Sequence, residues 1–342
     1  MEHGKDILAG YVKSVLHAAS SKGVPAEEIL SIVGLDRRLL DDPEARIGHD
    51  VMSSVWEECA RRTGDPDFGL HAGQLFVPQS YGVMGRVALT SPTVGGALER
   101  IKRYIGIVHT AIEIRFEVGE DAASFSFGLA VPPWILPRHW SESSLASEVM
   151  HIRRAVEEDI APLEVRFQHP EPADTREHSR VFRAPVRFGC GRNELVLDRA
   201  LLDRPTKAAD PELCAAYEAE ARDMLGRLGE ADGLLTLLRK TIFDSLGSGD
   251  LVQAAIARKM GLTPGTLRRK LAARGMSYRE LLGAMRRDLA LAYLQDRKWS
   301  LTDVAFVLGF GDSLAFKRAF ERWVGRSPAD YRRALFEPGT RG

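Results

Sequence analysis

The spacing of apolar residues along the first two thirds of the chain changes between two periods. Helical spacing over residues 6–20, and again near 50–62 and 141–158, predicts amphipathic helices. Between them, residues 111–118 and 123–131 alternate apolar and polar side chains around a Gly-Glu-Asp segment, which predicts a β-hairpin. Shorter runs predict strands near 163–168, 186–189 and 194–197. This part of the chain is therefore expected to be a mixed α and β domain.

From Ala209 onward the pattern is helical throughout. A stripe of apolar residues runs along a helix whose other face is charged, and it consists of Leu213, Tyr217, Met224, Leu225 and Leu228. Such a stripe packs either on its own domain or on a second copy of the chain, and the pattern leaves both open. The polar segment 229–233, Gly-Glu-Ala-Asp-Gly, is predicted to be a linker and the domain boundary.

Several predicted helices after this linker begin with residues that cap a helix. Asp250 precedes one apolar run, and Thr263 with Pro264 precedes the next. Three Ser-x-x-acid pairs follow, in which hydroxyl and carboxylate bond to each other's backbone donors: Ser277 with Glu280, Ser300 with Asp303, and Ser327 with Asp330. These caps predict short helices separated by tight turns.

Two of the breaks between these helices share one pattern, an alanine followed four residues later by a glycine and an apolar residue. It occurs at Ala257, Gly261 and Leu262, and again at Ala305, Gly309 and Phe310. The alanine lets a second helix cross closely, and the glycine supplies a left-handed turn. In each case the next helix carries Lys and Arg residues on one face. The pattern predicts two helix-turn-helix units, joined by one long helix over 278–294.

Charge is unevenly distributed along the chain, although the net charge is zero. Residues 234–336 contain 19 Lys and Arg against 9 Asp and Glu, which leaves 28 against 38 in the rest. One Ala-x3-Gly pattern is common in helical proteins, but two within a strongly basic segment favour a module that binds a polyanion. The acidic remainder is expected to have another task.

Residues 234–336 resemble the DNA-binding domain of the AraC/XylS family of bacterial transcription regulators. The resemblance is carried by Ala305, Gly309-Phe310, Phe316, Lys317-Arg318, Phe320, Gly325, Ser327-Pro328 and Tyr331-Arg332. It implies base-edge contacts from the second helix of each unit, at Gly265, Thr266, Arg268, Arg269, Ser313, Leu314, Lys317 and Arg318. Gly265 departs from the larger residues common at its position and has no side chain with which to read a base.

Arg269 and Arg318 are the main candidates for contacts to DNA, because a guanidinium can bond to guanine O6 and N7 together. A structural role within the bundle stays open for Arg318. The other arginines of this region are expected to contact phosphates or to form a solvated basic face: Arg286, Arg287, Arg326, Arg332 and Arg333. The core is expected to contain Leu267, Phe310, Phe316, Phe320 and Trp323.

Residues 81–104 and 169–205 resemble the N-terminal domain of AraC-type regulators of the ornithine-utilisation kind, which is labelled an arabinose-binding type. The resemblance implies a small-molecule sensor without naming its ligand. The segment 132–140, Pro-Pro-Trp-Ile-Leu-Pro-Arg-His-Trp, has two interpretations. It either lines an effector pocket, or it is a proline-rich connection whose tryptophans are in the core. The effector candidates are Trp134, Arg138, His139 and Trp140.

The histidines and cysteines do not form a pattern typical of catalysis or metal binding. All nine histidines lie at or before His178, but no His-Glu-x-x-His or related spacing accompanies them, so no metal, cofactor or enzymatic activity is expected. The alternative function is a cysteine-based alkylation or redox sensor, or a methyl acceptor that uses the helix-turn-helix units to reach DNA, with Cys190 as its thiol. A zinc-type cysteine cluster cannot be built from Cys59, Cys190 and Cys214 alone.

The sequence thus predicts an α+β effector-sensing domain over 1–205 and a helix with linker over 206–233 suited to dimerisation. An all-α tandem helix-turn-helix domain over 234–336 and a tail over 337–342 follow. The expected function is sequence-specific transcription regulation, with activation favoured, under control of a small molecule. Expected partners are double-stranded DNA, the effector, a second copy of the chain and RNA polymerase. No signal peptide or membrane segment is visible, so a cytoplasmic protein is expected.

Overall fold

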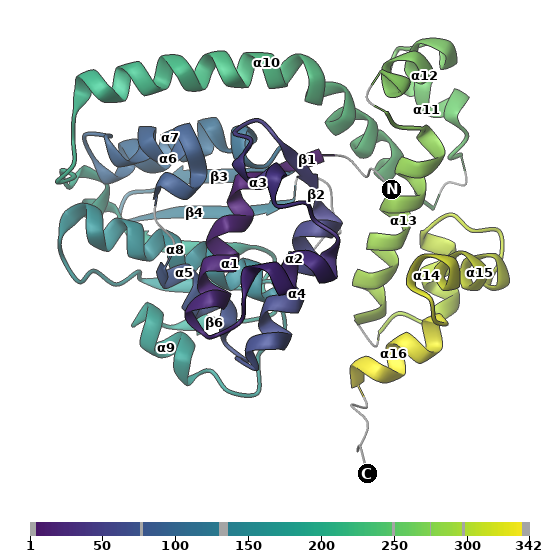
Figure 1. The fold of residues 1–342 in the computed structure, drawn as a ribbon, viewed down its shortest axis with the longest axis horizontal. Coiled ribbons are helices and arrows are strands. Elements are labelled where there is room, and N and C mark those ends of the chain that lie inside the picture. The colour runs from purple at the N-terminus through teal and green to yellow at the C-terminus, as the bar shows by residue number, and fades with distance from the viewer. Residues whose placement is uncertain are drawn as a thin grey trace. The chain divides into compact units, whose positions relative to one another are not determined.

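A computed structural model describes residues 5–75, 78–129, 136–247, 250–273, 275–295 and 298–336. The chain forms two compact units. The N-terminal unit contains Lys5–Ala130 and Ile135–Asp232, and the C-terminal unit contains Gly233–Gly342. Figure 1 gives the labels of their helices and strands.

The N-terminal unit is built from α and β elements, as the change of period predicted. Its strands are β1 (Lys5–Leu8), β2 (Arg46–Gly48), β3 (Ile112–Val118), β4 (Ala122–Leu129), β5 (Glu164–Arg166), β6 (Val186–Arg187) and β7 (Asn193–Asp198). Its α-helices are α1 (Val12–Ser21), α2 (Ala26–Val33), α3 (Arg38–Asp41), α4 (His49–Thr63), α5 (Phe68–Leu75), α6 (Gly82–Leu89), α7 (Val94–Val108), α8 (Arg138–Val156) and α9 (Arg176–Phe182). Short 3-10 helices are η1 (Ala9–Tyr11), η2 (Pro78–Tyr81) and η3 (Arg199–Asp203).

The predicted hairpin forms the edge of a five-stranded sheet. Its strand order is β3-β4-β7-β5-β6, and all neighbours are antiparallel except β5 and β6. Phe116 pairs with Phe125 across the hairpin, and their rings meet edge to face with their centres 6.1 Å apart. On β7 burial alternates, with Leu195 and Leu197 fully buried. The alternation read from the sequence is therefore the inward and outward alternation of a half-buried sheet.

The helix predicted over 6–20 is wrong in its first half. Lys5–Leu8 is the strand β1, which pairs with β2 so that Ile7 lies opposite Ile47, and the α-helix begins only at Val12. The two adjacent apolar residues Ile7 and Leu8 suit either period. The choice of strand depends on a partner about 40 residues away, which local spacing does not reveal.

The segment predicted as a linker, 229–233, is helical. It lies inside α10 (Pro211–Asp244), which Figure 1 shows as one uninterrupted ribbon. A glycine within a helix costs only about 1 kcal/mol relative to alanine, so flanking contacts can override it. Those contacts exist on both sides, since Ala221 is buried in the N-terminal unit and Leu238 in the C-terminal unit.

Tyr217 of the apolar stripe at the start of α10 packs on its own domain, which is one of the two arrangements left open above. Arg86 of α6 stacks on the Tyr217 ring at 4.9 Å and pairs with Glu220 at 2.8 Å. Glu218 pairs with Arg100 of α7 at 3.3 Å. Leu213 departs from the expected stripe, because 46% of its surface is exposed.

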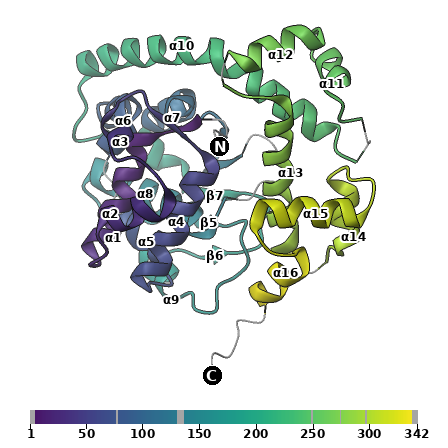
Figure 2. The same cartoon turned by 45° about the vertical axis from the view of Figure 1, so that its right-hand side comes forward.

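The C-terminal unit is all helical and contains two adjacent cores. After α10 come α11 (Gln253–Lys259), α12 (Pro264–Ala272), α13 (Tyr278–Gln295), α14 (Leu301–Val307), α15 (Ser313–Val324) and α16 (Pro328–Phe336). Leu281 and Met285 of α13 belong to the first core, and Leu289 and Leu294 to the second. Figure 2 shows α11 and α12 at one end of α13, and α14 to α16 toward the other. The long helix α13 therefore joins the two helix-turn-helix units, as predicted.

Candidate DNA-binding surface and effector pocket

The two helix-turn-helix units close their turns in the same way. Gly261 and Gly309 both adopt left-handed backbone conformations, with φ of 69° and 70°. The Leu262 amide donates to the Ala257 carbonyl at 2.8 Å, and the Phe310 amide donates to the Ala305 carbonyl at 3.0 Å. The repeat read from the sequence is therefore a repeat in hydrogen bonding as well as in residue type.

The helix that follows each turn begins at a side-chain cap. Thr263 accepts a hydrogen bond from the Thr266 amide at 3.1 Å, and Asp312 accepts one from the Ala315 amide at 2.6 Å. The three predicted Ser-x-x-acid pairs also cap their helices, at Ser277, Ser300 and Ser327. The prediction for Asp250 is wrong, because α11 is preceded by Val252 without a side-chain cap.

On α12 the predicted DNA contacts lie on the surface. Arg268 and Arg269 are exposed, and neither makes a hydrogen bond or ion pair with any described residue. Thr266 is half-buried, and its hydroxyl lies 2.9 Å from that of Thr263. Leu267 and Leu271 point into the first core. The helix therefore separates apolar residues from cations, as a helix that lies against DNA requires.

On α15 the predicted contacts are exposed as well. Leu314 exposes 58% of its surface, and the Ser313 hydroxyl lies 3.4 Å from that of Thr302. Lys317 is 3.9 Å from Glu321. Arg318 is exposed and has no hydrogen bond or ion pair within the described part of the chain, so it does not hold the bundle together in this structure.

Two arginines expected to lie on the basic face are instead part of the framework. Arg286 donates to the carbonyls of Leu308 and Gly309 at 2.8 and 2.7 Å, and its guanidinium lies 4.5 Å from the centre of the Phe310 ring. Arg286 therefore stabilises the turn of the second helix-turn-helix unit. Arg332 donates to the Leu294 carbonyl at the end of α13 at 3.4 Å.

The remaining arginines of that group lie beside other side chains of the domain. Arg287 pairs with Asp288 at 2.8 Å, and Arg333 pairs with Asp330 at 3.2 Å. Arg326 lies 4.7 Å from the centre of the Tyr331 ring. The basic excess of the domain is thus partly structural, and Arg268, Arg269 and Arg318 are among the arginines that are left for a ligand.

In the N-terminal unit, two of the effector candidates belong to a buried polar network. Arg138 donates to Glu142 at 2.7 Å and to Asp67 at 2.9 Å. The Nδ1 of His139 lies 3.7 Å from the Glu142 carboxylate, and the same nitrogen accepts a hydrogen bond from the Gly69 amide. Neither lines the large pocket described below. Trp134 lies outside the described residues, and Trp140 is buried and does line that pocket.

Glu142 is the centre of this network and is fully buried. The Nε2 of His178, which is also fully buried, lies 2.7 Å from its Oε1. Burial opposes ionisation of this carboxyl. The imidazoles of His139 and His178 and the guanidinium of Arg138 more than offset that effect and hold the pKa of Glu142 well below its usual value. Arg138 and His139 thus serve the fold.

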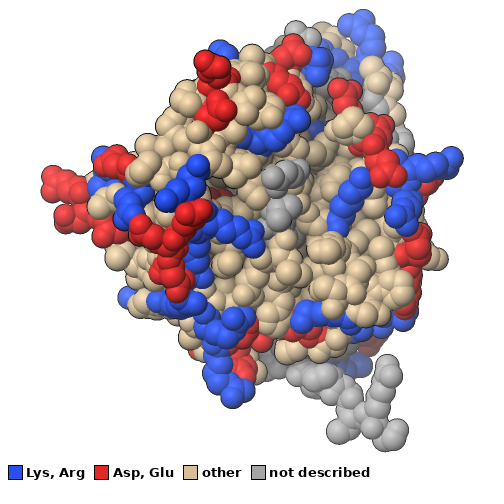
Figure 3. Space-filling view, turned by 60° about the vertical axis from the view of Figure 1, so that its left-hand side comes forward, with Lys and Arg blue, Asp and Glu red and all other residues tan. Residues whose placement is uncertain are grey.

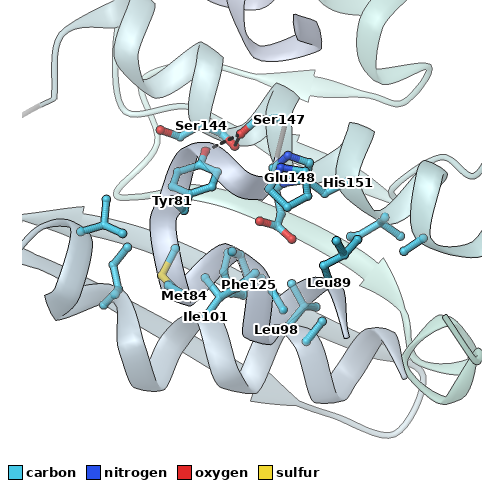
Figure 4. Close-up of a pocket in the computed structure, with 18 of the residues that line it drawn as sticks. Tyr81, Met84, Leu89, Leu98, Ile101, Phe125, Ser144, Ser147, Glu148 and His151 are labelled. Carbon is cyan, nitrogen blue, oxygen red and sulfur yellow. Dashed lines mark hydrogen bonds between the residues drawn. The ribbon is translucent and has the colours of Figure 1, made fainter. Parts of the chain in front are cut away.

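A pocket of about 480 Å³ lies within the N-terminal unit, a size typical of small-molecule sites. One wall is apolar and comes from α6, α7 and the sheet, including Met84, Leu89, Leu98, Ile101 and Phe125. The other wall is α8 together with Tyr81, the last residue of η2. Figure 4 shows these residues converging on one cavity.

The wall formed by α8 carries the polar groups of the pocket. Ser144, Ser147, Glu148 and His151 line it together. The Tyr81 hydroxyl lies 3.2 Å from the Ser147 hydroxyl, and Figure 4 shows the Glu148 carboxylate directed into the cavity. Glu148 has no hydrogen bond or ion pair with the residues that the structure describes, and burial raises its pKa to about 7.

These pocket residues were missed in the sequence, although a signal exists. Ser144, Ser147, Glu148 and His151 recur at helical spacing within the predicted helix 141–158. The residues between them, such as Leu145, Ala146 and Val149, are buried. A surface helix buries one face and exposes its polar face to solvent. When the residues on both sides of a polar stripe are buried, the stripe instead faces a cavity inside the protein.

A second pocket, of about 440 Å³, is lined by residues that include Glu57, Asp65 and His139. On the face drawn in Figure 3, Lys and Arg side chains lie beside Asp and Glu side chains around a broad uncharged area. Cys59 and Cys214 are buried, and Cys190 is half-buried. Among the described residues, no group of three or more His, Cys, Asp or Glu could hold a metal ion. Within the same ranges, no helix is long and apolar enough to cross a bilayer.

Two family models match the chain. One, described as the N-terminal arabinose-binding domain of AraC transcription regulators, matches residues 23–206, and a helix-turn-helix domain matches residues 256–334. The ornithine utilization regulator of Pseudomonas aeruginosa is 28% identical over 329 residues, covering 96% of each chain. The HTH-type transcriptional regulator VirS of Mycobacterium tuberculosis is 28% identical over 286 residues, covering 81% of each chain.

A solved structure is also similar. The crystal structure of the transcriptional regulator CdpR from Pseudomonas aeruginosa matches with 25% sequence identity and a TM-score of 0.43. The match covers 90% of this chain and 96% of that chain.

Proposed function

Because this chain belongs to the AraC-type transcription regulators with an arabinose-binding-type N-terminal domain, we propose that it is an effector-controlled activator that reads DNA with α12 and α15. The single observation behind this proposal is the exposure of Arg268, Arg269 and Arg318, which have no partner among the described residues and lie on helices whose opposite faces are buried. An unpaired guanidinium can bond to a guanine edge or to a phosphate without first breaking an ion pair.

The two reading helices differ in the contacts that they offer. On α12, Arg268 and Arg269 can bond to guanine edges and phosphates, while Gly265 contributes only backbone. On α15, Lys317 and Arg318 supply cations, and Leu314 supplies an apolar surface suited to a thymine methyl group. We propose that the helices enter successive major-groove segments of one operator, about 34 Å apart.

Control by a small molecule is proposed for the 480 Å³ pocket of the N-terminal unit. An effector that binds one arrangement of the two units more tightly would shift the population that binds the operator productively. Action as a homodimer and recruitment of RNA polymerase belong to the same proposal, as does a cytoplasmic location. The regulator names of the two relatives support the DNA-binding part only.

The test compares Arg318→Ala with Arg322→Ala, a second exposed arginine on the same helix. Operators are first selected from a random pool of duplexes with the unmodified protein. Arg318→Ala is expected to cost about 1–3 kcal/mol of binding free energy and to relax preference at one base pair. Arg322→Ala should leave base preference unchanged.

A uniform loss across all operator variants would show that Arg318 contacts phosphate only, and would contradict its role as a reader of bases. The salt dependence tests DNA binding itself. Affinity should fall steeply with salt concentration, because bound cations release counterions from the duplex. A flat dependence would remove the DNA-binding role of α12 and α15.

A further inference from the structure

The polar groups of the pocket differ in whether the protein already satisfies them. The hydroxyls of Ser144 and Ser147 donate to the carbonyls of Trp140 and Ser144, both at 3.0 Å. Tyr81 and Ser147 lie within hydrogen-bond distance of each other. Glu148, by contrast, contacts no hydrogen-bond donor among the described residues, and its carboxylate points into the cavity.

The only other carboxylate that lines the described pocket is already paired. Glu157 lies 3.5 Å from Lys207, which also lines the pocket. Arg154, the remaining cation of the lining, donates to the Gln74 carbonyl at 2.8 Å. Arg154, Glu157 and Lys207 lie at the end of α8 or beyond it in sequence, and their side chains are partly or largely exposed. Among the carboxylates of the lining, Glu148 is therefore the one that a ligand in the interior would have to satisfy.

An ionised carboxylate accepts hydrogen bonds and donates none, so its ligand partner must be a donor. Leaving a carboxylate unpaired in an apolar site is costly, and the raised pKa of Glu148 reflects that cost. A cationic donor would remove it, because an ammonium group satisfies charge and hydrogen bonding together.

The opposite wall limits the rest of the ligand. Leu98, Ile101 and Phe125 face the cavity from α7 and the sheet. A sugar placed there would leave hydroxyls without partners, at a cost of about 1–3 kcal/mol for each unpaired group. A hydrocarbon body would instead gain about 25 cal/mol for each Å² of apolar surface buried.

We propose that the effector of this protein is an apolar molecule with a single amine head, whose ammonium group binds the Glu148 carboxylate while its hydrocarbon body fills the space against α7. This inference rests on the proposed effector role of the pocket and specifies the chemical class of its ligand. A carboxylate ligand of the same shape is disfavoured, because its head would face a like charge.

The test uses the full chain and three probes of equal length: octylamine, octanol and octanoate. Trp140 lines the pocket, so its fluorescence reports occupancy, and Trp140→Phe assigns the signal to that residue. At pH 8, octylamine is expected to bind at least 10-fold more tightly than octanol, and octanoate more weakly than either. Arabinose serves as the polar probe and should give no change at millimolar concentration.

Glu148→Gln keeps the size of the side chain and removes its charge. It should reduce octylamine affinity at least 10-fold and leave octanol within about 2-fold, so that the preference between them disappears. The control is Glu157→Gln, which removes the paired carboxylate and should preserve the preference for the amine. Circular dichroism melting of each variant verifies that it is folded.

Tighter binding of octanoate than octylamine, or an amine preference that survives Glu148→Gln, would overturn the inference. So would failure of all three probes. These results leave the proposed function standing, because operator affinity and its salt dependence are measured on the same preparation without any probe. If octylamine binds through Glu148 yet operator affinity and transcription in vitro do not change, the amine site stands and effector control fails.

Discussion

The two units of this protein place charge in opposite environments. In the C-terminal unit the arginines assigned to DNA lie on the surface, where Arg268, Arg269 and Arg318 have no partners among the described residues. In the N-terminal unit the decisive charges are carboxylates inside the fold. Glu142 is held by three cationic or imidazole side chains, and Glu148 faces an apolar cavity.

This difference teaches how one kind of interaction can serve two tasks. An exposed cation costs little in the free protein and is available to a polyanion, and salt screens its effect. Salt hardly screens a carboxylate inside the protein. Such a carboxylate is therefore stabilised either by partners within the fold or by a group of a bound ligand. Exposed charge should therefore control binding and salt dependence, whereas buried charge should control stability and pH dependence.

The largest expected effect separates Glu142, which is fully buried, from Glu148, which is half-buried on the same helix. Glu142→Leu should lower the free energy of unfolding by about 3–5 kcal/mol, because it leaves Arg138 and His178 without their shared acceptor. Glu148→Leu should be neutral or stabilising, because it removes a carboxylate that has no partner among the described residues. Urea unfolding of both variants measures the difference. Equal losses would contradict the contrast between Glu142, whose carboxylate is hydrogen-bonded, and Glu148, whose carboxylate has no partner among the described residues.

The next effect is a pH dependence that belongs to Glu148. Its pKa of about 7 in the folded protein exceeds the ordinary value of 4.5, so the folded state holds a proton that the unfolded chain releases. Its contribution to stability is present below pH 4.5 and is lost as the pH rises toward 7, by at most about 3 kcal/mol and less where water enters the pocket.

Unfolding measured from pH 5 to pH 8 checks this, with Glu148→Gln as the reference that lacks the titration. The other titratable groups that line the pocket are Tyr11, Tyr81, His109, His151, Arg154, Glu157 and Lys207. They are present in both proteins, so the difference between the two curves isolates Glu148. Parallel curves would show that the pKa of Glu148 does not differ between the folded and the unfolded protein.

A third comparison tests buried against exposed arginines within the C-terminal unit. Arg286→Met should cost about 2 kcal/mol of stability, because the carbonyls of Leu308 and Gly309 lose their donors. Arg318→Met should change stability by less than about 0.5 kcal/mol. Thermal unfolding of both variants provides the measurement. A similar loss in both would restore the structural interpretation of Arg318.

The smallest expected effect concerns the first reading helix. Arg269→Ala should weaken operator binding by about 1.4 kcal/mol, which is 10-fold, and should reduce the salt slope by about one. Its control is Arg333→Ala, whose side chain pairs with Asp330. If Arg333→Ala weakened binding as much as Arg269→Ala, partner-free exposure would not distinguish DNA contacts from other surface cations.

Local features of the chain were predictable wherever neighbours in sequence decide them. The turns at Gly261 and Gly309, the caps at Thr263 and Ser300, and the β3–β4 hairpin all form within a few residues. Interpretations that depended on distant partners failed. Lys5–Leu8 became a strand because β2 pairs with it, and 229–233 stayed helical because packing on both sides outweighed its glycines.

The sequence by itself thus determined two helix-turn-helix units in a basic domain, since turn chemistry, capping and charge are all local properties. Only the tertiary structure decided which charges serve the fold and which face a ligand. Arg286 and Arg318 are the same residue type, but a turn 22 residues away in sequence engages only the first. Glu142 and Glu148 share one helix, yet segments far apart in the chain surround each of them differently. Burial and partners are properties of the folded chain, and they decide what each charge does.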